Sequence, residues 1–487
     1  MPTRLDAEVL IIGAGPTGLL LAGDLAAAGV AVTVLERRDQ ESNLTRAFAV
    51  HARTLELLDQ RGIAEELQAT GVCANGLRLF GQVHVTMNRL PSRFPHVLIT
   101  PQYHTERVLE DRALRHGAAI VHDAELISLR QDADGVDVLT RDSAGDERTR
   151  RAWYVVGADG HRSSVRHALG LDFPGRSVVR SVVLADVQLR NPPEQLPALE
   201  DSSDGFVFVA SFGDGWYRII ARDNSQNLPD DAPVDFADLQ ALARKVLRRD
   251  CGMHDPRFLS RFHSEERQAR RYRVGRVFLA GDAAHVHSPA GGMGMNTGLQ
   301  DAANLSWKLA AATRGRAPEG LLDSYQDERH PVGTATTRAS HVLLRAALLR
   351  NPLARGVRNL LGGTLMRLPF ARRRASEQVS GIGIGYDAPS GAHPLVGRRA
   401  PDLALHGGGR LYEALRHGRF VLVASDHEAL DTEPAEVVAA IPATPAAEVM
   451  LVRPDGHIGW AAERPDPADV RRALARWGCA PVGQQAA

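Results

Sequence analysis

The feature that most restricts the fold of this chain is a glycine-rich turn near its start. Residues 13–18 read GAGPTG and follow a continuous apolar run, and a helix and a second apolar run then lead to Glu36. Glycines at this spacing let a pyrophosphate approach a helix N-terminus, and a terminal acidic side chain can bind ribose hydroxyls. Residues 8–36 therefore predict a Rossmann-like unit that binds a dinucleotide. The alternative is a glycine turn that serves packing alone.

Composition restricts the class of protein further. The chain has 487 residues, which suggests about three domains, and its 58 basic and 58 acidic side chains balance. The three cysteines are far apart and form no CxxC motif, which predicts neither disulfides nor a cysteine metal site. The apolar stretch 9–35 is interrupted by glycines, a proline and an aspartate. We expect a cytoplasmic protein, monomer or homodimer, without a nucleic-acid or membrane partner.

A second motif lies at 276–309, where a short apolar run ends at Gly281-Asp282. A loop with Pro289 and three glycines follows, and the pattern predicts a helix from Thr297, capped by Asn296 or Thr297. This arrangement places a carboxylate and free backbone N–H groups at the edge of a sheet. It predicts a site for a ligand with hydroxyls at one end and an electron-rich group at the other.

A third motif repeats that logic in the middle of the N-terminal half. The apolar run 153–156 leads to Asp159-Gly160, and a helix follows. His161 lies next to it without spaced His, Asp or Glu partners, so we predict no metal site.

The rest of the chain differs in pattern. Residues 178–270 contain alternating segments that predict a largely antiparallel sheet, to which 75–100 contribute, and we place the substrate there. A helix is expected to end near Pro331, with another from Thr334 to about Arg350. The arginine-rich stretch 345–375 is interpreted as a solvated helix face, with a basic patch for a membrane or nucleic acid as the alternative. The expected divisions are 1–177, 178–270, 271–390 and 391–487.

The motifs together resemble a known family. The turn at 13–18, Asp159-Gly160 and Gly281-Asp282 look like the three fingerprints of single-component FAD-dependent aromatic hydroxylases of the para-hydroxybenzoate hydroxylase type. The likeness is strongest to actinomycete polyketide-tailoring hydroxylases and rifampicin monooxygenase and covers essentially the whole chain. Further similar stretches are 52–56, 58–62, 328–331 and 453–457. It implies an α/β fold: a Rossmann-like FAD-binding domain, an antiparallel-sheet substrate domain and a C-terminal thioredoxin-like domain without redox cysteines.

The resemblance also implies which residues bind FAD. Gly13, Gly15, Pro16, Thr17 and Gly18 would hold the pyrophosphate and Glu36 the adenosine ribose. Arg46 and Gln102 would approach the ribityl–flavin part, and Asp159-Gly160 the junction shared with NAD(P)H. Gly281-Asp282 would hold a ribityl hydroxyl, and Pro289, Gly294, Met295 and Asn296 would line the isoalloxazine ring. Arg37 and Leu126 are also assigned to the cofactor.

The implied activity is an NAD(P)H- and O2-dependent monooxygenation, with NADPH favoured. A flavin C4a-hydroperoxide would hydroxylate a polycyclic aromatic or phenolic, polyketide-like substrate. Only one GxGxxG is present, so the nicotinamide would visit transiently. The motifs identify no catalytic base; Arg46 is a candidate for a catalytic role, and His96, Tyr103 and His104 are weaker candidates for a base.

Several alternatives remain open at the level of sequence. The same scaffold could perform Baeyer–Villiger oxidation or epoxidation, or could inactivate an antibiotic. A flavin halogenase is disfavoured because residues 215–221 lack the second tryptophan and the proline of the GWxWxIP pattern. A protein of a different class would keep the FAD residues but act only as a flavin-bound carrier of a hydrophobic ligand.

Overall fold

The computed structural model describes residues 5–39, 47–425 and 437–479. Its first layer is a six-stranded sheet in the order β18-β19-β12-β1-β2-β8, parallel except for β18. The apolar run before the glycine turn forms β1, which pairs in register with both β12 and β2. The strands are β1 (Val9–Ile12), β2 (Val32–Leu35), β8 (Ala119–Val121), β12 (Tyr154–Gly157), β18 (Arg273–Val274) and β19 (Val277–Leu279). The central strands are buried on both faces, which explains their continuous apolar sequences.

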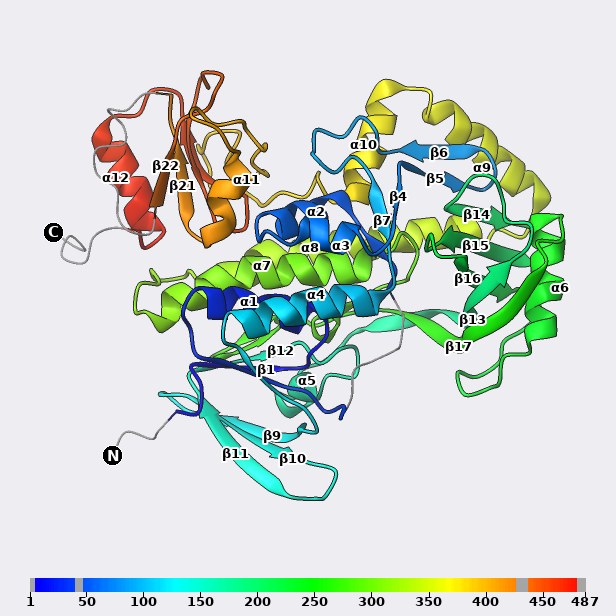
Figure 1. Cartoon of the computed structure of the whole chain (residues 1–487), viewed down its shortest axis with the longest axis horizontal. Helices are drawn as coiled ribbons and strands as arrows, with labels where there is room; N and C mark the ends of the chain where they lie inside the picture. Colours follow the sequence, from blue (N-terminus) through cyan, green and yellow to red (C-terminus); the bar gives the residue numbers. More distant parts are fainter. Residues whose placement is uncertain (1–4, 40–46, 426–436, 480–487) are drawn as a thin grey trace.

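Three long helices lie together above this sheet: α1 (Pro16–Ala27), α4 (Gln102–Arg115) and α7 (Met293–Thr313) (Figure 1). Helices α1 and α7 meet through Thr17. A Cβ on Gly281 would lie 2.7 Å from Thr17 Oγ1, and a Cβ on Gly298 would also collide with that atom. The two glycines therefore let the N-terminal turn pack directly against the later motif.

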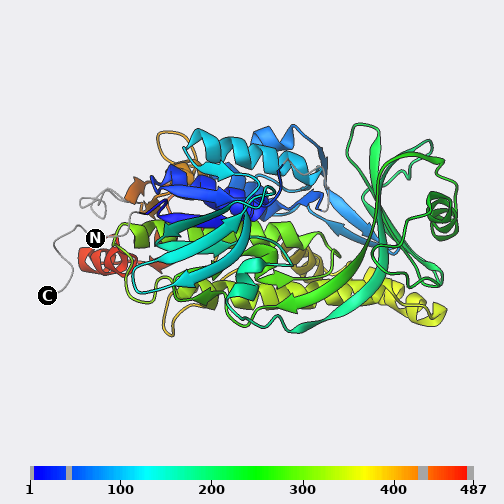
Figure 2. The ribbon, with the colours of Figure 1, turned by 90° about the horizontal axis from the view of Figure 1, so that it is seen from below.

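An eight-stranded sheet lies at one end of the molecule (Figures 1 and 2). Its order is β20-β17-β13-β16-β15-β14-β5-β6, and all its pairs are antiparallel except β14 with β5. Its strands are β5 (Gly76–Leu79), β6 (Val83–Thr86), β13 (Gly175–Leu189), β14 (Ala198–Asp201), β15 (Gly205–Ser211), β16 (Trp216–Asp223), β17 (Met253–Gln268) and β20 (His285–Val286). Helix α6 (Phe236–Leu247) covers one face. Both the 178–270 segment and the 75–100 segment supply strands to it, as the sequence predicts.

The last sheet is small and lies at the opposite end of the molecule (Figures 1 and 2). Its order is β22-β21-β23-β24, and α12 (Pro467–Arg476) follows it. The strands are β21 (Phe420–Val423), β22 (Val437–Ala440), β23 (Val449–Val452) and β24 (Ile458–Ala462). This unit is bound to α2 (Ala52–Asp59) by buried charge: Arg399 pairs with Glu56 at 3.1 Å, and Arg410 with Asp59 at 2.9 Å.

The helix that the sequence divides near Pro331 is continuous, so that prediction is wrong. Helix α8 runs over Ser324–Ala347 with Pro331 inside it. Arg329, two residues earlier, is buried and donates to Asp301 Oδ1 at 2.7 Å. Tyr325 donates to Leu279 O at 2.8 Å. We attribute the continuity to this anchoring, which outweighs the local cost of proline.

The remaining elements are short or peripheral. Two three-stranded sheets have the orders β11-β10-β9 and β3-β7-β4. The elements are β3 (Ala49–Val50), β4 (Val72–Ala74), β7 (Val97–Ile99), β9 (Glu125–Gln131), β10 (Val136–Arg141), β11 (Glu147–Ala152), α3 (Ala64–Gln68), α5 (Ser164–Ala168), α9 (Pro352–Leu365), α10 (Pro369–Ser380), α11 (Leu411–Ala414), η1 (Gly281–Ala283) and η2 (Leu415–His417). None of the helices in the described ranges is both long and apolar enough to cross a membrane.

Candidate cofactor site

The three glycines of the N-terminal turn have different surroundings. A Cβ on Gly13, whose φ is +107°, would lie 2.5 Å from Ala158 O, and one on Gly18 would collide with Gly13 O. A Cβ on Gly15 would meet no atom within 4 Å. Gly15 is also the N-cap of α1, which has no side-chain cap. Gly13 and Gly18 thus serve packing, while Gly15 leaves space for a ligand at the uncapped end of a helix.

Glu36 ends β2 next to this turn and is buried. Its carboxylate accepts the N–H of Ala14 at 2.7 Å and that of Arg38 at 3.0 Å. Burial alone would raise the pKa of Glu36, but these hydrogen bonds and the Arg38 guanidinium lower it overall, so the carboxylate is ionised and can accept further donors. Of the other two assigned residues nearby, Arg37 is exposed and Leu126 is buried in β9.

Asp159 follows β12, adjacent to β1, and carries an unsatisfied oxygen. Its Oδ2 accepts the N–H of Val165 at 3.2 Å, but its buried Oδ1 has no hydrogen-bond partner among the described residues. Burial raises the pKa of Asp159. A Cβ on Gly160 would point into open space. A buried carboxylate oxygen without a partner points to a missing donor, such as a ligand hydroxyl.

Arg166 links the second and third motifs, a role that the sequence did not indicate. Its guanidinium donates to His161 O at 2.8 Å and to Ala283 O at 2.9 Å, and it lies 3.8 Å from the centre of the Phe173 ring. It thereby holds the segment after Asp159-Gly160 against the turn that contains Asp282. Its signal in the sequence is a basic residue six positions after the DG pair.

The Gly281-Asp282 motif is supported from behind by a buried charge cluster. Asp301 Oδ2 accepts the N–H of Gly281 at 3.0 Å and lies 2.7 Å from His285 Nε2, while Asp301 Oδ1 accepts from Arg329. Burial would raise the pKa of Asp301, but Arg329 and His285 lower it overall. Asp282 itself is exposed, and no hydrogen bond of its carboxylate is found within the described residues. Asp301 fixes the turn, and Asp282 remains available to a ligand.

The loop after Asp282 differs from the prediction. Helix α7 begins at Met293, not at Thr297, and its N-cap is Gly292 at φ +63° without a side-chain cap. The side chains proposed as caps are already inside the helix: Thr297 Oγ1 donates to Met293 O, and Asn296 Nδ2 donates to Gly292 O. The first turn of α7, which contains Gly294 and Met295, therefore has free backbone N–H groups.

Two histidines flank this first turn. His51 is buried, and its Nε2 would lie 3.6 Å from a Cβ on Gly292. Burial lowers the pKa of His51 to about 4, partly offset by a hydrogen bond with the backbone of Gly291. His287 lies beside Gly294, and its buried Nε2 has no partner among the described residues. Neither histidine belongs to the predicted site residues, and His287 is one that the sequence motifs do not indicate.

The remaining predicted residues are dispersed. Arg46 lies outside the described residues. Gln102 Oε1 accepts the N–H of Ala47 at 2.9 Å, so it fixes the chain next to that segment. Pro289 is exposed on the loop. Among the candidate bases, Tyr103 and His104 contact each other at the start of α4, and burial lowers the pKa of His104. His96 lies 3.0 Å from Gln68 Nε2, and burial lowers its pKa too.

These features fit the groups that FAD presents. The open Gly15 and the end of α1 suit a pyrophosphate, Glu36 a ribose, Asp159 and Asp282 further hydroxyls, and the uncapped start of α7 an electron-rich ring. No group of three metal-ligating side chains occurs in the ranges that the structure covers. A parallel sheet with these three motifs at its edge, next to a separate antiparallel sheet, defines a flavoprotein.

The comparisons identify the family. The model described as "FAD binding domain" matches residues 6–340, and the one described as "Aromatic-ring hydroxylase, C-terminal" matches 393–481. The chain therefore belongs to the family of the FAD binding domain model, which matches more than half of it. It is an FAD-dependent monooxygenase of the aromatic hydroxylase type.

Three relatives illustrate the family's range. Rifampicin monooxygenase of Streptomyces venezuelae is 39% identical, with 98% of this chain and 100% of that protein covered. The structure of OxyS anhydrotetracycline hydroxylase from Streptomyces rimosus has a TM-score of 0.84 at 37% identity, covering 98% of this chain and 100% of that one. Dialkyldecalin synthase of Streptomyces rugosporus is 34% identical, with 97% and 99% covered.

Proposed function

We propose that the protein uses NADPH and O2 to hydroxylate a polycyclic aromatic or phenolic compound of polyketide type. The observation that carries the proposal is the convergence of the three motifs. Thr17 contacts Gly281, and Arg166 joins the segments that hold Asp159 and Asp282. One extended dinucleotide could therefore contact all three. The relatives that act on rifampicin and anhydrotetracycline support a substrate of this class.

The proposed contacts with FAD follow the chain. Residues 13–18 hold the pyrophosphate, Glu36 the adenosine ribose and Asp282 a ribityl hydroxyl. Asp159 and Gly160 serve the junction where NAD(P)H approaches. The other assignments are Arg37, Arg46, Gln102, Leu126, Gly281, Pro289, Gly294, Met295 and Asn296. Bound FAD would accept hydride from NADPH and activate O2 at its C4a atom.

The chain's own residues supply position and electrostatics. The backbone N–H groups at the start of α7 lie at the positive end of a 21-residue helix, where they would stabilise negative charge on a bound flavin ring. Burial lowers the pKa of His51 behind Gly292 to about 4, so this charge stabilisation would come from the helix N-terminus and not from an imidazolium. The apolar cluster that contains Phe48, Phe208 and Ala290 extends from this loop to the eight-stranded sheet and would keep water from the reacting ring.

A division into domains matches this arrangement. We propose that the cofactor is bound by 1–177 and 271–390, and the substrate mainly by 178–270. Strands β13 and β17 connect the two regions, because each begins or ends near a predicted boundary. We propose that 391–487 is a thioredoxin-like domain without redox function, since its only cysteine is Cys479.

The FAD assignment is tested at Asp282. The exposed Asp282 forms no hydrogen bond or ion pair within the described residues, so Asp282→Ala should leave the unfolding temperature of the apoprotein nearly unchanged. It should weaken FAD binding, measured by flavin fluorescence quenching, by about tenfold, the loss expected for one charge-assisted hydrogen bond. Asp387→Ala, also at an exposed position, is the matched control. Unchanged FAD affinity in Asp282→Ala contradicts the assignment.

A second function is favoured by one comparison. Dialkyldecalin synthase is not named as an oxygenase, although its similarity covers nearly the whole chain. The alternative to oxygenation is a protein that binds FAD, carries a hydrophobic ligand and does not turn the flavin over. Anaerobic mixing with NADPH and anhydrotetracycline or rifampicin separates the two: flavin absorbance bleaches in a monooxygenase and persists in a carrier. The mass of the aerobic product then distinguishes hydroxylation from Baeyer–Villiger oxidation or epoxidation.

A further inference from the structure

Helix α9 packs against the protein with its arginines instead of its leucines. Arg355 Nε pairs with Asp201 Oδ2 at 2.8 Å, and Arg358 pairs with Asp201 Oδ1 at 3.0 Å. The Arg358 guanidinium also lies 3.8 Å from the centre of the Phe80 ring. The charged side chains of α9 thus face the eight-stranded sheet, the reverse of an ordinary surface helix.

The opposite face of α9 is apolar and exposed. None of its residues is buried. Leu353 is 81% exposed and Leu360 69%. The exposed large apolar side chains of α9, which we call the α9 face, are Leu353, Val357, Leu360, Leu361 and Leu365. Their helical spacing places them on one side of α9, and an exposed apolar stripe of this kind marks an interaction surface. The prediction of a solvated, charged helix face is therefore wrong for α9.

The stretch of chain that carries the α9 face is rich in positive charge. Residues 330–376 contain nine arginines and no aspartate, glutamate or lysine, although the whole chain has a net charge of zero. The exposed arginines of this stretch are Arg338, Arg345, Arg350, Arg367, Arg373 and Arg374. The partner must therefore offer an apolar surface edged with negative charge.

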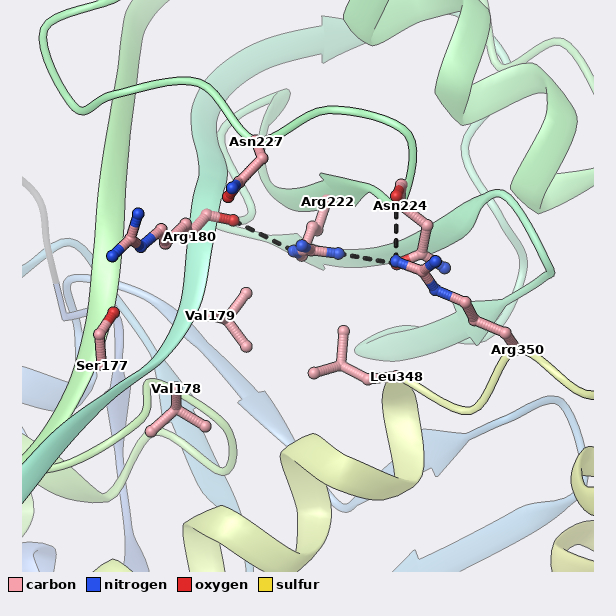
Figure 3. A pocket seen from close by; sticks show the side chains of 9 residues that line it. All are labelled: Ser177, Val178, Val179, Arg180, Arg222, Asn224, Asn227, Leu348 and Arg350. Carbon is pink, nitrogen blue, oxygen red and sulfur yellow. Dashed lines mark hydrogen bonds between the residues drawn. The ribbon is translucent and has the colours of Figure 1, made fainter.

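A pocket beside the link between α8 and α9 is also rich in arginine. It has a volume of about 370 Å³, and Arg180, Arg222 and Arg350 line it without a carboxylate among its lining residues (Figure 3). Arg222 donates to Asn224 Oδ1 at 2.8 Å, and Arg350 donates to the Asn224 carbonyl at 3.1 Å. Burial and the neighbouring Arg350 lower the pKa of Arg222. Guanidinium groups in this arrangement suit the oxygens of a phosphate.

The pocket and the α9 face adjoin in the chain, because Arg350 precedes Leu353 by three residues. A second copy of the protein that met this surface around a two-fold axis would bring one arginine-rich stretch against another. An anionic bilayer offers both an apolar layer and a negative surface. We propose that α9 docks the protein on anionic membranes, with its leucines in the interface and a phospholipid phosphate in the pocket of Arg222 and Arg350.

Co-sedimentation with vesicles tests the proposal. The holoenzyme should bind vesicles of phosphatidylcholine with phosphatidylglycerol, and added salt should weaken this binding. It should bind phosphatidylcholine alone much more weakly. The double variant Leu353→Gln/Leu360→Gln should lower the affinity at least tenfold, and Arg350→Gln severalfold. FAD content should not change, because these side chains lie on the surface away from the cofactor motifs.

Matched controls come from elsewhere on the surface. Leu114→Gln on α4 and Arg130→Gln on β9 alter exposed side chains of the same kinds and should leave vesicle binding unchanged. The proposal is overturned if the holoenzyme binds neither the anionic vesicles nor those of phosphatidylcholine alone. So does concentration-dependent dimerisation, seen by light scattering, that the double leucine variant abolishes. Binding of inorganic phosphate without binding of vesicles also overturns it. None of these outcomes depends on monooxygenase activity.

Discussion

The backbone N–H of His51 donates to the side-chain oxygen of Asn296 across 2.8 Å, which joins residues 245 positions apart in the chain. The amide nitrogen of the same Asn296 donates to Ala49 O at 2.9 Å and to Gly292 O at 2.8 Å. One buried side chain thus fixes strand β3 to the first turn of α7.

Replacement of this side chain should be detected at the flavin. Asn296→Ala removes three buried hydrogen bonds, which we expect to cost about 1–3 kcal/mol. The unfolding temperature of the apoprotein should fall, and FAD affinity should fall about tenfold because the start of α7 is no longer fixed. Exposed Asn191→Ala is the control. A lower unfolding temperature with unchanged FAD affinity would show that Asn296 serves the helix alone.

The glycines of the N-terminal turn should separate binding from folding. Gly15 has φ −81°, which alanine adopts, and a Cβ there meets no protein atom. Gly15→Ala should therefore leave apoprotein stability unchanged and weaken FAD binding by tenfold or more, measured by fluorescence titration. Gly18→Ala should instead destabilise the apoprotein, because its Cβ collides with Gly13 O. Equal effects of the two variants on stability would contradict this reading of the turn.

Stability should depend on pH through His51. Its pKa is about 4 in the folded protein against an ordinary value of 6.5, because the ring is buried. The unfolded chain then binds more protons between these values. The free energy of unfolding should fall as the pH falls from 6.5 to 4, by up to about 3 kcal/mol from this group. Urea unfolding measured at several pH values gives the free energy of unfolding across that range. This free energy should depend less on pH in His51→Gln than in the original protein, and its pH dependence should be unchanged in exposed His417→Gln.

The attachment of the C-terminal unit should depend on Glu328. Its carboxylate pairs with Arg453 at 2.6 Å and with the buried Lys308 at 2.8 Å, and these charges lower its pKa to about 2 although burial opposes the shift. Glu328→Gln leaves two buried cations without this partner and should cost about 3–5 kcal/mol. Calorimetry checks the effect. Glu147→Gln, which breaks the exposed pair with Arg141, should cost less than about 1 kcal/mol.

The sequence predicts those parts of the structure that local pattern determines. The turn at 13–18, strand β19 and most of the eight-stranded sheet follow from glycine spacing and apolar runs. Within 178–270, local pattern does not indicate strand β17, because its sequence MHDPRFLSRFHSEERQ is charged and contains Pro256. It forms because it pairs along nearly the whole of β13, with register shifts that absorb the irregularities. Long-range pairing therefore replaces the missing local signal.

The candidate site divides in the same way. Its ligand-facing residues lie in short motifs, so the sequence predicts them. The residues behind them do not: Asp301, His285 and Arg329 come from three elements, and only the fold shows that they support Gly281. The sequence also does not show which side of α9 packs against the protein. The spacing of its apolar residues is visible in the sequence, but the ion pairs with Asp201, more than 150 residues away, determine which side faces inward.

The charge pairs between α2 and the C-terminal unit affect how this enzyme can be recombined. Arg399 and Arg410 reach Glu56 and Asp59, and Arg53 in return donates to Asp455 O at 2.7 Å. Helix α2 begins directly after His51, so the unit supports the segment that borders the proposed flavin loop. A chimera that imports only the C-terminal residues of a relative would place foreign side chains against native acids. An exchange that carries residues 52–59 along with the C-terminal unit preserves both halves of the contact.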